Sequence, residues 1–396
     1  MAYNILVVED HLFQHKYLLD LFDSLGDVSV SSAFNGDEAL ALLREQRFDL
    51  VLSDLMMPSM DGLQLVQKMG EFKHKPAMAF MSSAPGRIMV SASLAAKNLG
   101  FKVLGQIAKP VNLGSLRKLL DKLVSFGSDV VATVRVPPEH SFVDLSHALS
   151  SRQIQPWFQP KKSLSTGRIV AAEALARWDH PRLGLLLPRD FLPNIIRHDL
   201  EETLLMEFVT QTISAQSLWR DQGYDIPVTI NLPTHLLGND DLPDRLHERV
   251  ASVGGLHSKI GFELMESSVA ENLGHYFSGV CRLRFKGFGL AQDDFGKGYS
   301  SYFNLVSTPF TELKIDRSLV FGCVENENLE AALSSIVALG KKLGLNVVAE
   351  GVETPDELAL LSRINCDQAQ GFVISKAIDP QRFSSLLNED GPAHSI

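Results

Sequence analysis

Short apolar runs alternate with helix-like periodicity over the first 125 residues of the chain. The runs that predict strands are Ile5–Val8, Leu50–Leu52, Met78–Met81 and Val103–Ala108. Between them, stretches such as Gly36–Arg44 and Leu63–Met69 have the spacing of amphipathic helices. Strands that alternate with helices predict a parallel sheet covered on both faces. We therefore expect residues 1–125 to form a doubly wound, flavodoxin-like α/β domain.

The same alternation returns over a longer span after a break. The composition of residues 126–140, which include a Pro-Pro pair, predicts a linker. Residues 141–388 hold strand candidates with helical stretches between most of them: Trp157–Gln159, Ile169–Trp178, Val228–Leu232, Ile260–Leu264, Gly289–Asp293, Glu312–Ile315, Asn346–Ala349 and Ala369–Ile374. This pattern predicts a TIM-type (β/α)8 barrel, whose active site lies at the carboxyl ends of the strands. We expect residues 389–396 to be a disordered tail.

Bulk composition narrows the class of protein. A chain of 396 residues exceeds the usual size of one core, so two domains are expected. The 37 Lys and Arg against 47 Asp and Glu give a net charge of −10, which argues against DNA binding. The three cysteines are far apart, which suggests a reducing compartment and no zinc site. Because neither a signal peptide nor a membrane-spanning run is recognisable, we expect a cytoplasmic protein.

Carboxylates follow the apolar runs of the first domain. Glu9 and Asp10 follow the first run, and Asp54 follows the second. Ligands of doubly wound sheets bind beyond these strand ends, so the three side chains should converge and favour a cation, for which oxygen ligands indicate Mg²⁺. Ser82 could donate to a bound anion, and Lys109 offers a positive charge. The set predicts that Asp54 can carry a phosphoryl group. A solvated acidic loop beside an unrelated lysine is the plainer alternative.

Residues 3–125 resemble the receiver domain of two-component response regulators. Besides the residues above, the resemblance rests on Asp54-Leu-Met-Met-Pro58-Ser-Met-Asp61-Gly62 and Lys109-Pro110. It implies that Asp54 accepts a phosphoryl group from a sensor histidine kinase or phosphotransfer protein, with one Mg²⁺ on Glu9 and Asp10. Ser82 and Lys109 would sense the phosphate. Gln106 departs from the pattern, since receivers often carry a switch aromatic there, which points to a different route for the signal.

Carboxylates also stand at strand ends of the second domain, where apolar residues would otherwise be expected. Alternation along a strand places Glu173, Leu175 and Arg177 on one face, the barrel lumen. The polar residues of later strand ends are Asn231, Glu263, Glu266, Asp293, Asp294, Lys314, Asp316, Glu350 and Gln370. Such a set could hold two metal ions about 4 Å apart. Lys314 could then orient a water, and Glu350 could accept its proton.

Single members of this set have plainer explanations. Arg177 and Trp178 could form a cation–π pair at the rim. Asp316 and Arg317 could form a structural ion pair, and Glu353 fits a solvated or outer position. A metal-free explanation must nevertheless satisfy several carboxylates in one barrel mouth, which favours the metal site: Glu173, Glu263, Asp293, Asp294 and Glu350.

Residues 145–386 resemble the EAL family of cyclic-di-GMP phosphodiesterases. The matching motifs are Phe158-Gln159-Pro160, Glu173-Ala-Leu-Ala-Arg177-Trp178, Asn231, Glu263-Leu-Met-Glu266-Ser267, Asp293-Asp-Phe-Gly-Lys-Gly-Tyr-Ser-Ser301, Leu313-Lys-Ile-Asp-Arg317, Glu350-Gly-Val-Glu353 and Gln370-Gly-Phe372. The resemblance implies primary metal ligands at Glu173, Asn231, Glu263 and Asp293. Asp294 would complete a second metal site, and Glu350 and Lys314 would activate water. Nucleotide contacts would come from Gln159, Leu175, Arg177 and Gln370.

The two resemblances together imply a phosphorylation-controlled phosphodiesterase. It would hydrolyse one bond of cyclic di-GMP to give pGpG, with Mg²⁺ or Mn²⁺, as a homodimer or larger homo-oligomer. Glu266 would anchor the loop that begins at Asp294 and that helps such barrels dimerise. Met265 replaces the usual Thr, Lys297 a small residue or Thr, and Ala377 a common Pro. Met265 and Lys297 lie near the loop, so they bear on loop order and dimer coupling more than on the chemistry.

Two other functions compete with this prediction. The barrel could bind cyclic di-GMP without cleaving it and signal through protein contacts, although degenerate members of the family lack ligands that this chain retains. A transcriptional regulator would need a basic recognition helix. The acidic balance and the lack of sequence for a third domain argue against it.

Overall fold

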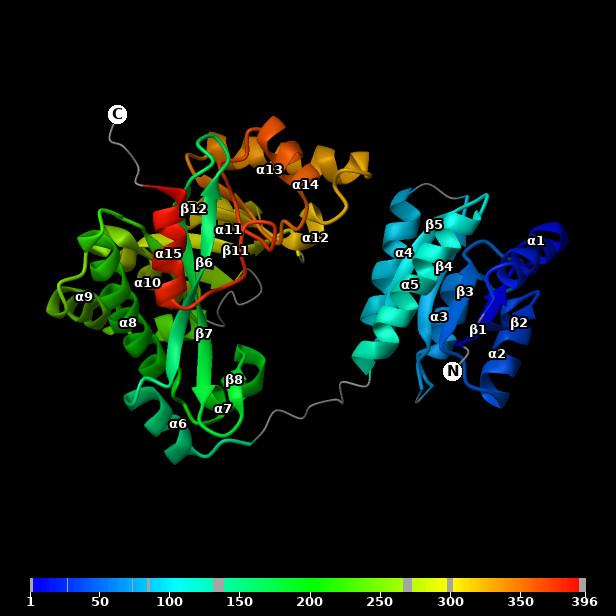
Figure 1. Cartoon of the computed structure of the whole chain (residues 1–396), viewed down its shortest axis with the longest axis horizontal. Coiled ribbons are helices and arrows are strands. Elements are labelled where there is room, and N and C mark those ends of the chain that lie inside the picture. The colour runs from blue at the N-terminus through cyan, green and yellow to red at the C-terminus, as the bar shows by residue number, and fades with distance from the viewer. Residues whose placement is uncertain are drawn as a thin grey trace. The chain divides into compact units, whose positions relative to one another are not determined.

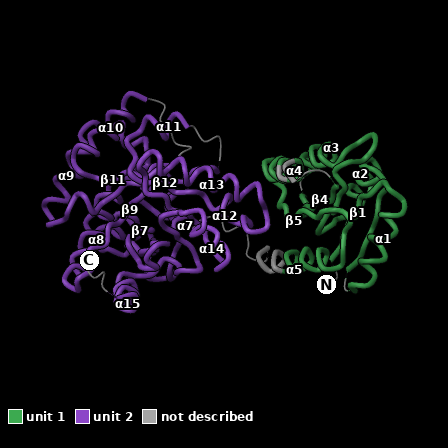
Figure 2. The backbone as a smooth tube through the Cα atoms, turned by 90° about the horizontal axis from the view of Figure 1, so that it is seen from above, with its two compact units in different colours: residues 1–135 green, residues 136–396 purple. Residues whose placement is uncertain are grey.

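The computed structural model describes residues 3–26, 28–72, 74–83, 86–130, 139–265, 273–297 and 302–391. The chain divides into two compact units, Met1–Arg135 and Val136–Ile396 (Figure 2). Among the described residues, no helix is long and apolar enough to cross a membrane.

The first unit is a five-stranded parallel sheet with helices on both faces (Figure 1). Its strands are β1 (Tyr3–Val8), β2 (Val28–Ala33), β3 (Leu50–Asp54), β4 (Ala77–Ser82) and β5 (Val103–Ala108). Its helices are α1 (Leu12–Asp23), α2 (Gly36–Glu45), α3 (Gly62–Met69), α4 (Gly86–Asn98) and α5 (Leu113–Val130). The strand order β2-β1-β3-β4-β5 is that of flavodoxin-like folds, so the predicted fold is confirmed.

Both faces of the central strands of this sheet are buried, which explains why β1, β3 and β4 contain continuous apolar runs. Along β1, Ile5 and Val7 belong to one hydrophobic cluster, and Leu6 and Val8 belong to another. Neighbouring residues of a strand point to opposite faces, so each face receives its own core. The polar residues at the strand ends are not part of either core, so they can form a binding site.

The second unit is an eight-stranded barrel, as the sequence predicted. Its strands are β6 (Ile154–Ser163), β7 (Ile169–His180), β9 (Val228–Asn231), β10 (Ile260–Met265), β11 (Gly289–Phe295), β12 (Glu312–Ile315), β13 (Asn346–Ala349) and β14 (Gln368–Ala369). A short strand, β8 (Gly184–Leu186), pairs with β7 outside this ring. One feature departs from a regular (β/α)8 barrel: β6 runs antiparallel to both of its neighbours, β7 and β14.

Helices surround the barrel strands (Figure 1). They are α6 (Phe142–Ser150), α7 (Pro188–Arg197), α8 (Glu201–Asp221), α9 (Leu242–Ser252), α10 (Leu273–Phe285), α11 (Tyr302–Ser307), α12 (Arg317–Val320), α13 (Glu327–Lys342), α14 (Pro355–Arg363) and α15 (Pro380–Asp390). Two 3₁₀ turns, Thr234–Gly238 and His257–Lys259, precede α9 and β10 respectively.

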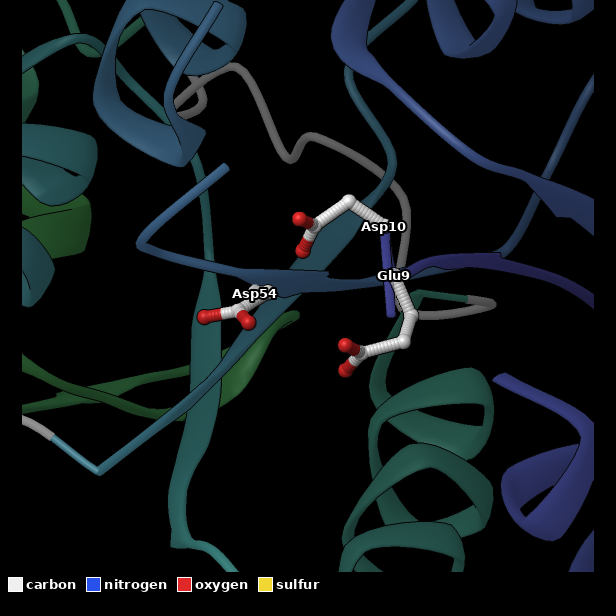
Figure 3. Close-up of side chains that lie close together, drawn as sticks. All are labelled: Glu9, Asp10 and Asp54. Atoms are coloured by element: carbon white, nitrogen blue, oxygen red, sulfur yellow. The ribbon is translucent and has the colours of Figure 1, made fainter. Parts of the chain in front are cut away.

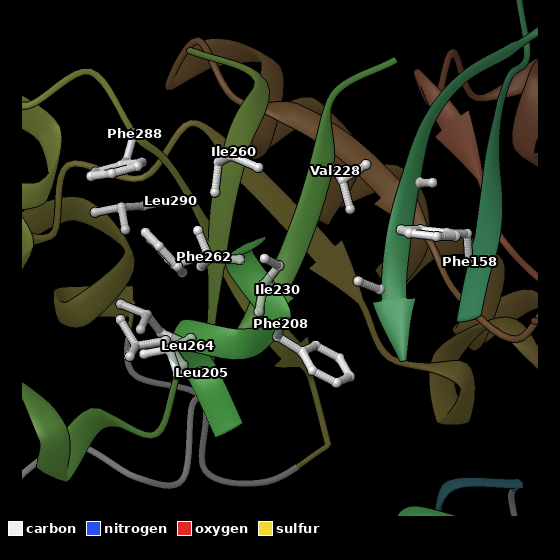
Figure 4. Close-up of a cluster of buried hydrophobic side chains, with 14 of the residues drawn as sticks. Phe158, Leu205, Phe208, Val228, Ile230, Ile260, Phe262, Leu264, Phe288 and Leu290 are labelled. Atoms are coloured by element: carbon white, nitrogen blue, oxygen red, sulfur yellow. The ribbon is translucent and has the colours of Figure 1, made fainter. Parts of the chain in front are cut away.

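The barrel core lies between the strands and these helices. Figure 4 shows part of it, including Val228 and Ile230 from β9 and Ile260, Phe262 and Leu264 from β10. These residues alternate with polar or small ones, such as Asn231 and Glu263, that belong to the opposite face of the same strands. The apolar side chains on one face of each strand thus pack against the helices, and the side chains on the other face point into the lumen.

Three segments differ from the sequence-based boundaries. Residues 126–130, predicted as linker, continue helix α5, while residues 131–138 lie outside the described residues. Glu389 and Asp390, predicted as disordered, complete α15, because the Asp390 carboxylate accepts a hydrogen bond from the Ile169 backbone N–H at 2.7 Å. Residues 392–396 of that predicted tail lie outside the described residues.

The last barrel strand is shorter than predicted. It ends at Ala369 rather than at Ile374, because the chain turns at Gly371, whose carbonyl accepts the Ile374 N–H at 3.1 Å. A β-carbon on Gly371 would lie 2.1 Å from the Val352 carbonyl oxygen, so this close approach requires glycine. Gln370 therefore follows the strand directly, at the barrel mouth.

Candidate functional site

The receiver carboxylates meet at the carboxyl ends of β1 and β3. Glu9 and Asp10 follow β1, and Asp54 is the last residue of β3. One oxygen from each of the three lies within 4.8 Å of the others, and Figure 3 shows the three side chains. Glu9 is fully buried and Asp54 nearly so. Oxygen ligands at this spacing suit a hard cation such as Mg²⁺.

Lys109 lies across this group of carboxylates. Its Nζ is 2.7 Å from Glu9 Oε2 and also contacts Asp54 Oδ2. Burial lowers the pKa of Lys109, but the hydrogen bonds with Asp54 and Glu9 outweigh that effect and raise it above its usual value. Ser82, at the end of β4, is buried, and its carbonyl accepts the Lys109 N–H at 3.1 Å. The structure thus brings together all five residues that the sequence singled out.

The loop after β3 holds Asp54 in place. The Met56 N–H donates to Asp54 Oδ1 at 2.9 Å, which leaves Oδ2 toward Lys109. A β-carbon on Gly62 would lie 2.4 Å from the Asp54 carbonyl oxygen, so only glycine lets the start of α3 pass this close. Gln106 instead points to α4, where its amide donates to the Ser93 hydroxyl at 2.7 Å and to the Met89 carbonyl at 3.0 Å.

In the barrel, one buried lysine lies among four carboxylates, of which three belong to strands β7, β10 and β11 and the fourth follows β13 directly. Lys314 Nζ on β12 is 2.8 Å from Asp293 Oδ1 and from Glu350 Oε1, and 3.3 Å from Glu173 Oε2. It also contacts Glu263 Oε2. The Lys314 side chain is only 1% exposed, so it binds these groups and not bulk solvent.

Burial and mutual repulsion shift the pKa values of these acids upward, except for one. Burial and the neighbouring Glu263 raise the pKa of Glu173 to about 7, and burial raises that of Glu350 to about 8. Burial also raises the pKa of Asp293. Burial would raise the pKa of Glu263 as well, but Lys314 and Lys161 lower it to about 2. Burial lowers the pKa of Lys314, yet the surrounding carboxylates raise it well above its usual value.

Amide side chains complete the wall of the site. Gln370 Nε2 donates to Glu173 Oε2 at 2.6 Å and to Gln159 Oε1 at 3.2 Å. The amide of Asn231, at the end of β9, lies 3.4 Å from Glu173 Oε1. Gln159 in turn donates to the Ser375 carbonyl at 3.1 Å. The Glu173 carboxylate is therefore contacted by three side chains: Asn231, Gln370 and Lys314.

A second group of acids lies at the end of β11. Oxygens of Asp293, Asp294 and Glu350 all lie within 4.8 Å of one another. Asp294 has a positive φ of 56°, which turns the chain sharply at this point. Lys297 Nζ donates to Asp294 Oδ2 at 2.7 Å. Glu350, which the sequence suggested as a base, is thus also placed where it could help to hold a metal.

A cavity of about 290 Å³ opens over these residues. The predicted residues that line it are Gln159, Glu173, Leu175, Asp293, Lys314, Glu350 and Gln370. Arg317, Glu353 and Phe372 also line it, although the sequence analysis gave the first two only structural or outer roles. Glu266, the predicted loop anchor, lies outside the described residues.

Two side-chain pairs that the sequence suggested as alternatives, Arg177 with Trp178 and Asp316 with Arg317, have other partners in the structure. Arg177 stacks over Trp157, with 5.9 Å between the guanidinium and the ring centroid, while Trp178 is buried in the core. Arg317 pairs with Glu353 at 2.8 Å, whereas Asp316 accepts the Ser318 N–H at the start of α12. Arg177 and Trp178 are neighbours along β7 and point to opposite faces, which explains the first error. Asp316 caps the start of helix α12, which explains the second.

The sequence analysis also missed Lys161. It lies on β6 two residues after Gln159, is fully buried, and contacts Glu263 at 3.2 Å. With it, the lumen holds five carboxylates against two ammonium groups: Glu173, Glu263, Asp293, Glu312 and Glu350 against Lys161 and Lys314. This excess of carboxylates over ammonium groups offers oxygen ligands that fit divalent cations of the Mg²⁺ or Mn²⁺ type.

Comparison with known proteins supports both of the domain families that the sequence resembles. Residues 143–377 match the family described as EAL domain, and residues 5–121 match the response regulator receiver domain. The chain is 30% identical to the cyclic di-GMP phosphodiesterase RocR of Pseudomonas aeruginosa, over 96% of this chain and 97% of RocR. The chain therefore belongs to the EAL domain family and carries a response regulator receiver domain before its EAL domain.

Other relatives match the barrel. The bifunctional diguanylate cyclase/cyclic di-GMP phosphodiesterase MucR of Pseudomonas aeruginosa is 32% identical over 60% of this chain, which spans only 35% of MucR. Among solved structures, the PaMucR phosphodiesterase in complex with c-di-GMP aligns with a TM-score of 0.57 at 32% identity, over 61% of this chain and 98% of that one. An EAL domain protein from Listeria monocytogenes aligns with a TM-score of 0.56 at 25% identity, over 63% and 99% of the two chains.

Proposed function

We propose that this protein is a metal-dependent phosphodiesterase that hydrolyses one phosphodiester bond of cyclic di-GMP to give linear pGpG. The observation that carries the proposal is the buried set of carboxylates around Lys314 at the barrel mouth. The similarity to RocR over nearly the whole chain supports the choice of substrate. So does the similarity of the barrel to a phosphodiesterase solved with c-di-GMP.

Oxygen atoms of five side chains would hold two Mg²⁺ or Mn²⁺ ions: Glu173, Asn231, Glu263, Asp293 and Asp294. Such a metal pair supplies an activated water and neutralises the charge that develops on the phosphate. The excess of carboxylates over ammonium groups in the lumen supports this assignment, because a divalent cation would balance it.

The chain's own residues then orient the reactants. Lys314 contacts four carboxylates, which already occupy its three N–H donors. A donor of Lys314 would become free to orient a water once those carboxylates bind metal ions. Burial raises the pKa of Glu350 to about 8, so its ionised form is a stronger base than an ordinary carboxylate and can accept the proton of that water. The water oxygen bonds to phosphorus, the P–O3′ bond breaks, and the 3′-oxygen receives a proton. Gln159, Leu175, Arg177 and Gln370 would contact the nucleotide.

The receiver would regulate this activity through Asp54. We propose that Asp54 accepts a phosphoryl group from a sensor histidine kinase or phosphotransfer protein, with one Mg²⁺ on Glu9 and Asp10. The grouping of these carboxylates with Lys109 supports the assignment. Phosphorylation would alter the receiver–barrel or barrel–barrel arrangement in a homodimer or larger homo-oligomer. Equal turnover with and without beryllofluoride, a phosphoryl mimic, would contradict this regulation.

Chromatographic detection of pGpG tests the catalytic proposal. The intact chain with Mg²⁺ is expected to convert cyclic di-GMP to pGpG, and Glu173→Ala is expected to lose at least about 100-fold in rate, because losing a metal ligand should cost no less than losing an outer-shell partner. A matched control is Glu207→Ala, since Glu207 lies on α8 outside the cavity. Unchanged turnover in Glu173→Ala would contradict the proposal.

A receptor that binds cyclic di-GMP with little cleavage is the second candidate. One observation favours it: Lys297 donates to the Asp294 carboxylate at 2.7 Å, on an oxygen that the second metal would need. Binding of the nucleotide by the intact chain, without pGpG over many hours in Mg²⁺ or Mn²⁺, would decide for the receptor.

A further inference from the structure

Lys161 is a fully buried lysine whose hydrogen-bonding capacity is completely used inside the barrel. Its Nζ lies 2.9 Å from Thr229 Oγ1, 3.2 Å from Glu263 Oε1 and 2.6 Å from Glu312 Oε1. An ammonium group has three N–H donors, and these partners account for all three. Lys161 therefore has no donor left for a nucleotide, and its action must pass through the residues that it contacts.

The contacts of Lys161 join three different barrel strands. Thr229 lies on β9, Glu263 on β10 and Glu312 on β12, while Lys161 itself lies on β6. Glu312 is held on its other oxygen by the Asn346 amide at 3.1 Å, which keeps the ammonium in place. Glu312 precedes Lys314 by two residues on β12, so Lys161 lies one step deeper in the lumen than the carboxylate cluster.

These contacts divide the two oxygens of Glu263. Oε1 receives hydrogen bonds from Lys161 and from the Thr229 hydroxyl, whereas Oε2 contacts Lys314 at the level of the cavity. Among the residues that the structure describes, none from the deeper layer supports Glu173 in this way, since its oxygens contact Asn231, Lys314 and Gln370. Of the carboxylates around Lys314, Glu263 is thus the one that is held by hydrogen bonds from the deeper layer of the lumen.

We propose that Lys161, together with Thr229, is a positioning residue that fixes Glu263 Oε1 and thereby aims Oε2 at the metal site. The inference rests on the proposed metal-dependent function, which it extends to residues that touch neither substrate nor metal. Partners that orient a metal ligand typically contribute about 10- to 100-fold to metal affinity.

Charge and positioning make opposite predictions for this lysine. If Lys161 only balances charge, Lys161→Met removes a positive charge near the site and should tighten the binding of a divalent cation. If Lys161 positions Glu263, the same substitution frees that carboxylate and weakens binding. Lys162→Met is the matched control, because it makes the same charge change at the next residue, which is only partly buried.

Binding of Mn²⁺ to the full chain, followed by electron paramagnetic resonance titration, tests the inference without relying on turnover. We expect Lys161→Met to bind Mn²⁺ about 10- to 100-fold more weakly than the native chain, and Lys162→Met to bind it equally well. Equal or tighter binding by Lys161→Met would overturn the positioning role. A native chain that binds no Mn²⁺ at its barrel site would overturn the proposed function, and this inference with it.

Thr229 provides a test that keeps the charge of the lumen constant, should Lys161→Met fail to fold. Thr229→Val removes the hydroxyl that donates to Glu263 Oε1 while keeping the shape, and Thr229→Ser keeps the hydroxyl. We expect Thr229→Val to weaken Mn²⁺ binding about 10-fold and Thr229→Ser to retain it. Native-like binding in Thr229→Val would contradict the inference.

Discussion

The receiver and the barrel each hold a lysine among carboxylates at the carboxyl ends of parallel strands, but they hold it differently. Lys109 follows β5, is 11% exposed in its side chain, and pairs with two carboxylates. Lys314 lies within β12, is 1% exposed, and contacts four carboxylates. Lys109 would be able to follow the phosphoryl group proposed for Asp54, whereas Lys314 is held by more contacts and is more deeply buried.

Under the proposed function, this difference would separate a signalling site from a catalytic one. In the receiver, Lys109 contacts Asp54 directly, so a phosphoryl group on Asp54 would change the partners of that lysine. In the barrel, Lys314 and Lys161 form ion pairs with carboxylates on several strands. These carboxylates outnumber the two ammonium groups, which favours the binding of cations. Under the proposed function, the same residue types would serve a reversible switch in one unit and a fixed catalytic site in the other.

Removing the phosphoacceptor should have the largest effect on the switch. We expect Asp54→Asn to abolish phosphoryl incorporation from acetyl phosphate, because an amide cannot accept the group, while the barrel still binds Mn²⁺. A phosphate-affinity gel measures the incorporation. Asp37→Asn, an exposed position on α2, serves as the control. Phosphorylation that persists in Asp54→Asn would place the acceptor elsewhere.

Removing one barrel carboxylate should sharpen the contrast between the sites. Asp293→Asn keeps the shape of the side chain but removes a charge 2.8 Å from Lys314. We expect the rate of cyclic di-GMP hydrolysis to fall by more than about 100-fold, since a metal ligand is lost. The corresponding receiver variant, Asp10→Asn, should leave the rate of the unphosphorylated chain unchanged. Equal losses in both variants would break the distinction drawn here.

The pH should affect metal binding in the barrel by about 10-fold. Because burial raises the pKa of Glu173 to about 7, this group is mostly protonated at pH 6 and mostly ionised at pH 8. A metal must displace that proton, so affinity falls as the pH falls. One proton with this pKa predicts Mn²⁺ binding about 10-fold weaker at pH 6 than at pH 8. A flat calorimetric profile over this range would show that Glu173 is already ionised without metal.

The smallest effect is expected at the rim of the barrel site. Lys297 is 61% exposed in its side chain and pairs with Asp294, so its ammonium competes with a cation for that carboxylate. We expect Lys297→Thr to tighten Mn²⁺ binding by about two- to five-fold, the scale of an exposed ion pair. Lys376→Thr, whose ammonium lies over Phe372, is the control. Weaker binding in Lys297→Thr would mean that Lys297 supports the loop rather than competing with metal.

Local sequence patterns predicted the strand ends well, because a carboxylate after an apolar run is visible without knowledge of the fold. Glu9, Asp54, Glu173 and Asp293 were found in this way. The structure places Asp54 at the end of β3, Glu9 directly after β1, Asp293 near the end of β11 and Glu173 inside the long strand β7. Both fold classes followed from the alternation of strand-like and helix-like segments along the chain. The hydrophobic pattern within each strand indicated how many of its faces are buried. Strand β2 was missed, because four of the six residues of Val28–Ala33 are serine or alanine.

Properties that depend on pairing between distant segments could not be predicted. Periodicity carries no information on strand direction, so the antiparallel β6 was not foreseen. Lys161 was overlooked because its partners on β9, β10 and β12 are 68 to 151 residues away in the sequence. The partners of Arg177 and Arg317 depended on strand register and helix capping in the same way.

Hydrolysis of cyclic di-GMP by the full chain in ¹⁸O-labelled water tests the central claim most directly. The account predicts Mg²⁺- or Mn²⁺-dependent formation of pGpG in which mass spectrometry finds one ¹⁸O atom in the 5′-phosphate, because water attacks phosphorus and the P–O3′ bond breaks. Bound but uncleaved nucleotide, or pGpG without the label in its 5′-phosphate, would contradict it.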